Sequence, residues 1–437
     1  MNEVIVGIIG LTVVLLLFLT GIELAFAMIL IGFLGFGYLV SFNAALNLLA
    51  KDFFDVLDSY GFTVIPLFIM MGQIAFNSGI AKRLYDAAYK FIGHIPGGLA
   101  MATVAGATAF KAICGSSPAT AATFASVAVP EMDRYNYDKR LSTGIVATVG
   151  TLGILLPPSV TLIVFGIITD QSIGRLFLAG VFPGLLIALF FIFVIYGWCK
   201  INPALGPKGQ RSSWGQRMRA LPEVVWVILI FCLVIGGILY GFFTPTEAGS
   251  VGTFLVLVLT VTKRDLNFKA FIKSVAESVR TGCMVIMLIA GSTVLGHFIA
   301  VTKIPMLAAD WIVGLPLHAN IIMVIICFVY LLGGSFIDDL AFMILATPIF
   351  FPAIAKLGFN PLWFGIMIGI TVMVGVVIPP VAINVFVVKQ ITKTPFSTIY
   401  AGVYPFLISL VVGAILLFLF PGLATWLPAK LMGTPPV

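Results

Sequence analysis

The stretch that decides the fold is Gly-Ile-Leu-Leu-Pro-Pro-Ser-Val at residues 153–160, because the chain repeats its pattern as Gly-Val-Val-Ile-Pro-Pro-Val-Ala at residues 375–382. Both copies lie inside long apolar runs. A proline pair removes two backbone N–H donors and clashes with the preceding turn, so each run must be a helix interrupted near its centre. At membrane depth the freed carbonyls persist only when they are buried in protein or line a polar cavity. Two interrupted helices at matching positions of two halves indicate a transporter binding site.

The composition is that of a membrane protein. Of the 437 residues, 61% are hydrophobic and 9% are charged, and the mean hydropathy of +1.16 excludes a soluble domain. A formal charge of +7 alone would suit a nucleic-acid-binding protein, but the basic residues lie in connectors between apolar segments, where they orient the chain in a lipid bilayer. The sequence has no hydrolase motif and no P-loop, so we expect neither an enzyme nor an ATPase.

The chain divides into two halves that carry matching motifs. Gly115-Ser116 matches Gly334-Ser335 at an offset of 219, and Gly153 matches Gly375 at an offset of 222. Internal repeats of this kind are typical of secondary transporters. We therefore predict an all-α polytopic membrane protein with two inverted-topology repeats, about ten full spans, two re-entrant hairpins and two broken helices. The repeats cover residues 1–199 and 223–437, and a cytoplasmic linker at 200–222 joins them.

Each repeat is predicted to contain the same parts. The first has scaffold spans at 1–60, a hairpin at 97–130 and a broken span at 141–169, and the second has scaffold spans at 223–280, a hairpin at 319–356 and a broken span at 361–390. The alternative for each hairpin is a pair of ordinary short spans, and the repeat favours the hairpin. Two amphipathic segments, 43–60 and 267–280, are predicted to be helices that lie at the membrane interface.

The basic residues predict the orientation. When the spans are threaded through a bilayer, most of the 24 lysines and arginines fall on one face, which is expected to be cytoplasmic. Both termini then lie on the opposite side of the membrane. The two hairpins enter from opposite sides, which is what inverted repeats require.

Polar side chains gather at the two hairpin tips. Ser116, Ser117 and Thr120 offer hydroxyl oxygens at the first tip, and Ser335 and Asp338 offer oxygens at the second. Oxygen ligands suit a hard cation such as sodium, while the N-termini of half-helices suit an anion. The sequence therefore predicts that a cation and an anion bind close together near the bilayer centre.

Lys111 lies one helical turn before the first tip, deep within an apolar run. A lysine at this depth is costly unless it faces water, a counter-charge or a ligand. Three interpretations remain open: Lys111 binds a substrate carboxylate, it pairs with Asp338, or its side chain extends to the cytoplasmic edge. Asp339 is expected to point to another face and to have a structural role.

Several motifs together resemble the large membrane (M) subunit of the tripartite ATP-independent periplasmic (TRAP) transporters, over essentially the whole chain. They are Cys-Gly-Ser-Ser-Pro-Ala-Thr at 114–120, the two Gly-x-x-x-Pro-Pro breaks, Phe-Thr-Pro-Thr-Glu-Ala-Gly at 243–249 and Gly-x-x-x-Asp at 334–338. The resemblance implies a sodium-coupled elevator in the bacterial inner membrane, with both termini periplasmic, that imports an organic anion such as a dicarboxylate or a sugar acid. It also implies two partners, a small four-helix membrane (Q) subunit and a periplasmic substrate-binding protein (P subunit).

The resemblance implies positions for two sodium sites and a substrate site. The sodium sites would involve Ser116, Gly153 and Leu156 at the first, and Gly334, Gly375, Ile378 and Val381 at the second. Substrate contacts are expected from Lys111, Ser117, Pro118, Thr120, Pro158, Ser159, Asp338 and Pro380. This chain departs from the family pattern at Ile378, where threonine is usual, at Ala382, where glycine is usual, and at Lys111, where a small residue is usual.

Two other functions share the broken helices. A passive anion channel would have them, and so would an ion-coupled carboxylate transporter that works without a binding protein. The channel differs in a measurable way, because its flux would not stop when the sodium gradient is collapsed.

Overall fold

The computed structural model describes residues 2–433, which form helices and connecting turns without any strand. The α-helices of the first half are α1 Glu3–Leu19, α2 Leu24–Leu39, α3 Phe42–Asp58, α4 Val64–Asn77, α5 Ile80–Ile92, α6 Gly98–Lys111, α7 Ser117–Arg134, α8 Lys139–Val149, α9 Val160–Ile168 and α10 Ile173–Ile201. Those of the second half are α11 Trp214–Leu239, α12 Pro245–Thr262, α13 Phe268–Val301, α14 Ile304–Val313, α15 Ala319–Phe336, α16 Asp339–Lys356, α17 Pro361–Gly375, α18 Ile383–Thr392, α19 Phe396–Leu419 and α20 Gly422–Met432. Short 3₁₀ helices are η1 Tyr60–Thr63, η2 Gly150–Ile154 and η3 Pro203–Leu205.

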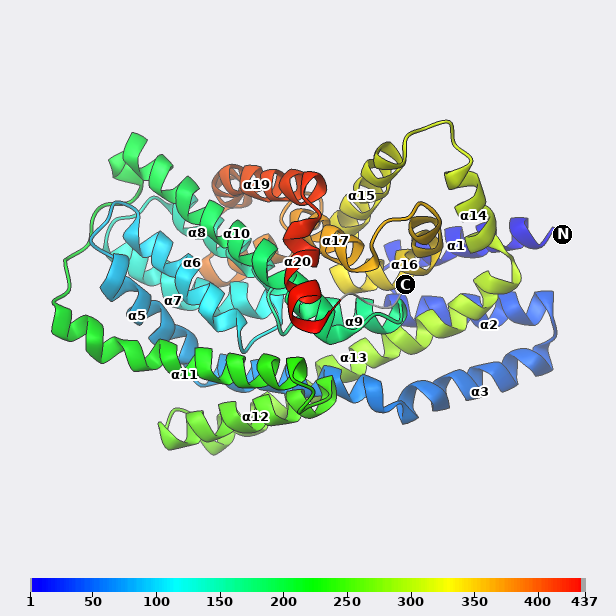
Figure 1. Cartoon of the computed structure of the whole chain (residues 1–437), viewed down its shortest axis with the longest axis horizontal. Helices are drawn as coiled ribbons and strands as arrows, with labels where there is room; N and C mark the ends of the chain where they lie inside the picture. Colours follow the sequence, from blue (N-terminus) through cyan, green and yellow to red (C-terminus); the bar gives the residue numbers. More distant parts are fainter. Residues whose placement is uncertain (1, 434–437) are drawn as a thin grey trace.

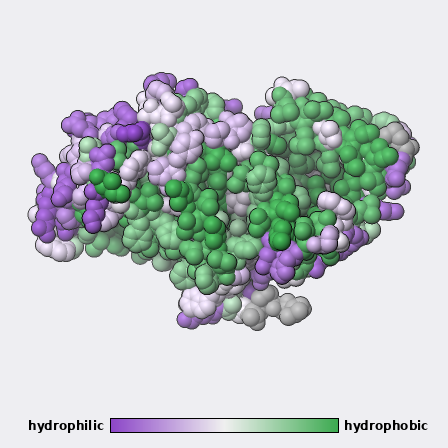
Figure 2. Space-filling view, turned by 90° about the horizontal axis from the view of Figure 1, so that it is seen from above, coloured by the Kyte–Doolittle hydropathy of each residue, from purple (hydrophilic) through white to green (hydrophobic). Residues whose placement is uncertain are grey.

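The helices confirm an all-α polytopic membrane protein. Within the described residues, 8 helices are long and apolar enough to cross a membrane, and several shorter ones, including α1 and α2, are equally apolar. Figure 2 shows a broad hydrophobic surface across the molecule, with hydrophilic side chains gathered toward the left end. Figure 1 places α5 and the connection between α10 and α11 at that end. An apolar surface of this extent requires a lipid environment.

The predicted hairpins and broken spans all appear as interrupted helices. In each hairpin the two arms pack against each other, α6 against α7 and α15 against α16. The first broken span is α8, η2, a break at 155–159 and α9, and the second is α17, a break at 376–382 and α18. In both breaks the Pro–Pro peptide bond is cis. The inverted relation of the halves and the side on which the termini lie stay predictions.

Two predicted boundaries were wrong. Residues 267–280 are not a separate interfacial helix, because α13 continues through them without interruption for 34 residues. Its counterpart α3 does end before the next span, because Ser59 adopts an extended conformation there. The linker predicted at 200–222 is also shorter, since α11 begins at Trp214 with a capping box between Ser213 and Gln216.

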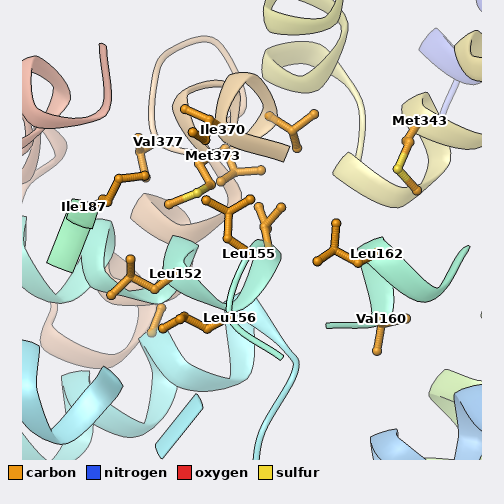
Figure 3. Packing of buried hydrophobic residues seen from close by; sticks show 14 of the residues in the cluster. Leu152, Leu155, Leu156, Val160, Leu162, Ile187, Met343, Ile370, Met373 and Val377 are labelled. Atoms are coloured by element: carbon orange, nitrogen blue, oxygen red, sulfur yellow. The ribbon is translucent and has the colours of Figure 1, made fainter. Parts of the chain in front are cut away.

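The two halves pack into one another around the broken spans. Where a Cβ on Gly144 of α8 would stand, backbone atoms of Gly402 in α19 lie as close as 2.3 Å, so only glycine permits this approach. Figure 3 shows the side chains of Leu152 and Leu155, from the first broken span, beside Ile370 and Met373 of α17. In Figure 1, α6 and α7 lie toward one end, α15 and α16 toward the other, and α9 and α17 between them. The hairpin tips therefore approach each other at the centre.

Candidate functional site

A cavity of ≈ 160 Å³ lies between the two hairpin tips and the helices α4 and α13. Its polar lining comes from Gln73 of α4, Ser116 and Ser117 at the first tip, Asp338 and Asp339 at the second, Thr161 of α9 and Thr281 of α13. Hydrophobic residues of α4 and α13 close the other side. A small pocket with a few convergent polar groups, placed where interrupted helices meet, has the character of a ligand site in a transporter.

The first tip is organised by the start of α7. Ser116 is the N-cap of this helix, and its hydroxyl accepts a hydrogen bond of 3.3 Å from the Ala119 N–H. Pro118 follows in the first turn, where its missing N–H costs nothing. The tip touches the first break directly, because a Cβ on Gly115 would lie 2.3 Å from the carbonyl oxygen of Pro158. Tip and break therefore form one unit.

Lys111 is completely buried at the end of α6. Its Nζ donates a hydrogen bond of 2.8 Å to the carbonyl oxygen of Ser116. The ammonium also lies against Gly153, since a Cβ at that position would stand 2.2 Å from Nζ. The side chain thus connects the first tip to the first broken span, and it does not line the cavity.

The second tip is organised by Asp338. Its carboxylate is the N-cap of α16 and accepts hydrogen bonds from the N–H groups of Leu340 and Ala341, at 3.1 and 3.3 Å. The pairing of Lys111 with Asp338, one of the three interpretations left open by the sequence, is absent, because each group has another partner. No ion pair between the two occurs in the part of the chain that the structure describes.

The second break approaches the second tip through backbone atoms. A Cβ on Gly375 would lie 2.9 Å from the carbonyl carbon of Gly334, and the Val381 N–H donates a hydrogen bond of 3.1 Å to the carbonyl oxygen of Ser335. Gly334, Gly375 and Val381, all expected at the second sodium site, are therefore close together. Ile378 is half-buried in the same break.

The expected substrate residues fall into two groups. Ser117, Pro118 and Asp338 line the cavity. The other five lie outside its lining. The Thr120 and Ser159 hydroxyls donate to the carbonyl oxygens of Ser116 and Ile154, respectively, and Lys111 Nζ donates to the Ser116 carbonyl oxygen. Pro158 faces Gly115, and Pro380 is exposed. Of the residues expected at the first sodium site, Ser116 and Gly153 both lie next to the Lys111 ammonium. The third, Leu156, packs its side chain against Gly184 of α10.

The sequence did not predict the positions of two residues in this region, Asp339 and Asn384. Asp339 does not face away from the site, because it lines the cavity and is buried. Asn384 of α18 is buried and donates hydrogen bonds to Ser117 Oγ at 3.0 Å and to the Ala147 carbonyl oxygen at 3.1 Å. A single amide just after a proline pair in an apolar run was the signal that could have identified Asn384.

The sequence of this chain matches a family model over residues 11–423, under the description "Tripartite ATP-independent periplasmic transporter, DctM component". The chain belongs to this family. As a TRAP large permease subunit, it is therefore a multi-pass membrane protein of a transport system, as the resemblance predicted.

Relatives within the TRAP family differ in the substrates that their names state. The C4-dicarboxylate TRAP transporter large permease protein DctM of Pseudomonas aeruginosa is 34% identical, over 87% of this chain and 89% of its own length. The sialic acid TRAP transporter large permease protein SiaM of Vibrio cholerae is 30% identical, over 95% of this chain and 97% of its own length. The isethionate TRAP transporter permease protein DctMQ of Oleidesulfovibrio alaskensis is 33% identical over 88% of this chain, which spans 59% of that longer protein.

Solved transporter structures share the fold at low sequence identity. The Alcanivorax borkumensis YdaH transporter superposes with a TM-score of 0.64 at 15% identity, covering 89% of this chain and 90% of its own. Neisseria gonorrhoeae MtrF superposes with a TM-score of 0.55, also at 15% identity, covering 87% of this chain and 84% of its own. These likenesses concern the arrangement of helices alone.

Proposed function

We propose that this chain imports a small organic anion, coupled to the inward movement of sodium. The observation that carries the proposal is the meeting of two hairpin tips at one cavity to which both contribute polar groups, each tip backed by the break of a broken helix. Broken helices provide both N-terminal ends that attract anions and loose carbonyls that bind cations. Family membership supports transport, and the names of the relatives support a carboxylate or a similar acid as substrate.

The anion is expected to bind at the start of α7. The N-terminus of a helix carries a partial positive charge, which attracts a carboxylate. Lys111 adds a buried positive charge behind the tip without contacting the cavity. A cavity of ≈ 160 Å³ suits a short-chain acid better than a bulky one.

The coupling ion is expected at the second break. Gly334, Ser335 and Gly375 bring backbone oxygens of the tip and the broken span together, and oxygen ligands suit sodium. The half-buried Ile378 and the exposed Val381 border this region. The carboxyl groups of Asp338 and Asp339 add oxygen atoms at the same tip, and oxygen ligands suit a hard cation.

The moving part is expected to contain the hairpins and broken helices, because tips and breaks are joined by close backbone contacts. Helices α1–α4 and α11–α13 would form the static scaffold of an elevator. A small four-helix membrane subunit and a periplasmic binding protein would complete the system in the bacterial inner membrane. The fused name of the isethionate relative, DctMQ, supports a membrane partner.

The experiment is uptake into proteoliposomes that contain this chain with its small membrane subunit. C4-dicarboxylates, sugar acids and sulfonates are offered with and without the periplasmic binding protein. Accumulation should require an inward sodium gradient and the binding protein, and it should stop when an ionophore collapses the gradient. Undiminished flux without either would instead identify a passive channel.

A further inference from the structure

Lys111 already donates a hydrogen bond to the Ser116 carbonyl oxygen, which a cation at the first break would need as a ligand. A backbone carbonyl oxygen has two lone pairs. The Ser116 oxygen accepts from Lys111 Nζ at 2.8 Å, from the Thr120 hydroxyl at 3.0 Å and from the Thr120 N–H at 3.3 Å. Both lone pairs are therefore in use, and none is free to bind a sodium ion.

The space beside this carbonyl is also filled. The ammonium lies against the Cα of Gly153, where a Cβ would approach to 2.2 Å. Gly153 belongs to η2, which continues α8 to its C-terminal end. That end of a helix carries a partial negative charge, so it attracts a cation. The ammonium of Lys111, which is 0% exposed, supplies one there.

The hairpin and broken span of the second half contain no lysine at the position that corresponds to Lys111. At the offset of 219, Lys111 corresponds to Tyr330, whose hydroxyl is hydrogen-bonded to Thr347 at 3.1 Å. The sequence contains no lysine or arginine in residues 319–355 or 361–388. The tip and break of the second half therefore approach each other around Gly334 and Gly375, and neither of these two segments carries a lysine or arginine.

We propose that the Lys111 ammonium is a tethered cation that permanently fills the first of two pseudo-symmetric cation positions, so that this chain binds sodium at the second break alone. The proposal rests on the proposed sodium coupling and specifies its stoichiometry. A lysine ammonium is a compact positive charge with three donors, and it can replace a monovalent ion among carbonyl oxygens.

The test is equilibrium binding of radioactive sodium to the purified complex of this chain with its small membrane subunit. The wild type should bind one sodium ion per complex. Lys111→Ala should bind two, because the change removes the ammonium charge and its hydrogen bond to the Ser116 oxygen, and it opens the space beside Gly153. Lys111→Met should still bind one, since it removes the charge but keeps most of the volume. Lys356→Ala, which removes a surface ion pair with Asp310, is the matched control and should match the wild type.

Two outcomes overturn the proposal. Two sodium ions bound to the wild type would show that the first position takes sodium despite the lysine, although the proposed coupling would survive. Equal sodium counts in the wild type and a folded Lys111→Ala variant would show that Lys111 does not fill a sodium position. If instead the wild type bound no sodium but Lys111→Ala bound one, the tethered cation would stand and sodium coupling at the second break would fall.

A second variant decides the question if Lys111→Ala does not fold. In Gly375→Ala the new Cβ would lie 2.9 Å from the Gly334 backbone, which forces the second tip and break apart. With Lys111 present, this variant should bind no sodium at all. Any sodium retained by Gly375→Ala would locate a working site at the first break and contradict the proposal.

Discussion

The Asn384 side chain donates a hydrogen bond of 3.0 Å from Nδ2 to the Ser117 hydroxyl, although 267 residues separate the two. Asn384 opens α18 after the second break, and Ser117 opens α7 at the first hairpin tip. The same amide donates to the Ala147 carbonyl oxygen of α8. One side chain of the second half thus holds the first hairpin against the first broken span.

Replacing Asn384 by alanine should weaken this connection. The change removes three buried hydrogen bonds and leaves the Ala147 carbonyl without this donor, so we expect a loss of about 1–2 kcal/mol in the free energy of unfolding. Thermal unfolding in detergent measures it. Asn43→Ala, at an exposed position of α3, is the control and should leave Tm unchanged. Equal Tm values for both variants would argue against a role for Asn384 in joining the halves.

Ala382 should be replaceable by glycine with a gain in stability. Its backbone lies in the left-handed region, at φ 50° and ψ 63°, where a Cβ is unfavourable. Glycine removes this penalty but loses more entropy on folding, which leaves an expected gain of about 0.5–1 kcal/mol. The measurement is Tm. The control is Ala353→Gly, at a buried position of α16, which should lower Tm because glycine destabilises a helix interior. A lower Tm for Ala382→Gly would contradict the assigned backbone conformation.

The contribution of Asp86, in helix α5, to the stability of the fold should depend on pH. Burial removes water from its carboxylate and raises its pKa, which Lys82 partly lowers and Glu131 raises further. A carboxyl with a raised folded pKa destabilises the fold while ionised, and the penalty disappears as pH falls through that pKa toward the ordinary value. Asp86→Asn should therefore raise Tm at pH 7.

The gain from Asp86→Asn should shrink as the pH falls below the raised pKa, because the wild-type carboxyl is then protonated as well. Thermal unfolding of both proteins between neutral and mildly acidic pH follows this difference. The exposed Asp58→Asn variant on α3 is the control. A gain that stays constant over this range would show that the effect does not come from ionisation of Asp86.

The sequence predicted the breaks well because proline acts locally. Each pair, at 157–158 and 379–380, interrupts its helix whatever surrounds it, and the structure has both interruptions. The continuity of α13 was missed for the opposite reason. Amphipathic charge patterning in residues 267–280 suggested an interfacial helix, but no residue there stops the helix before the next span.

The site was harder to predict because its contacts cross between distant segments. The sequence places Lys111 near the first tip, but only the fold shows its ammonium between Ser116 and Gly153. Asp339 was placed on the wrong face because the chain turns sharply between Ile337 and the start of α16. Asn384 carries no local motif, and its partners lie in the other half.

The most direct test of the account is the initial rate of organic-anion uptake into proteoliposomes at varied sodium gradients, for the wild type and Gly375→Ala side by side. Gly197→Ala, in α10 with open space around the new Cβ, serves as the control. We predict that wild-type and Gly197→Ala rates rise with the gradient and vanish when it is collapsed, while Gly375→Ala shows no sodium-driven uptake. Sodium-driven uptake by Gly375→Ala at the wild-type rate, or wild-type uptake that ignores the gradient, would contradict the account.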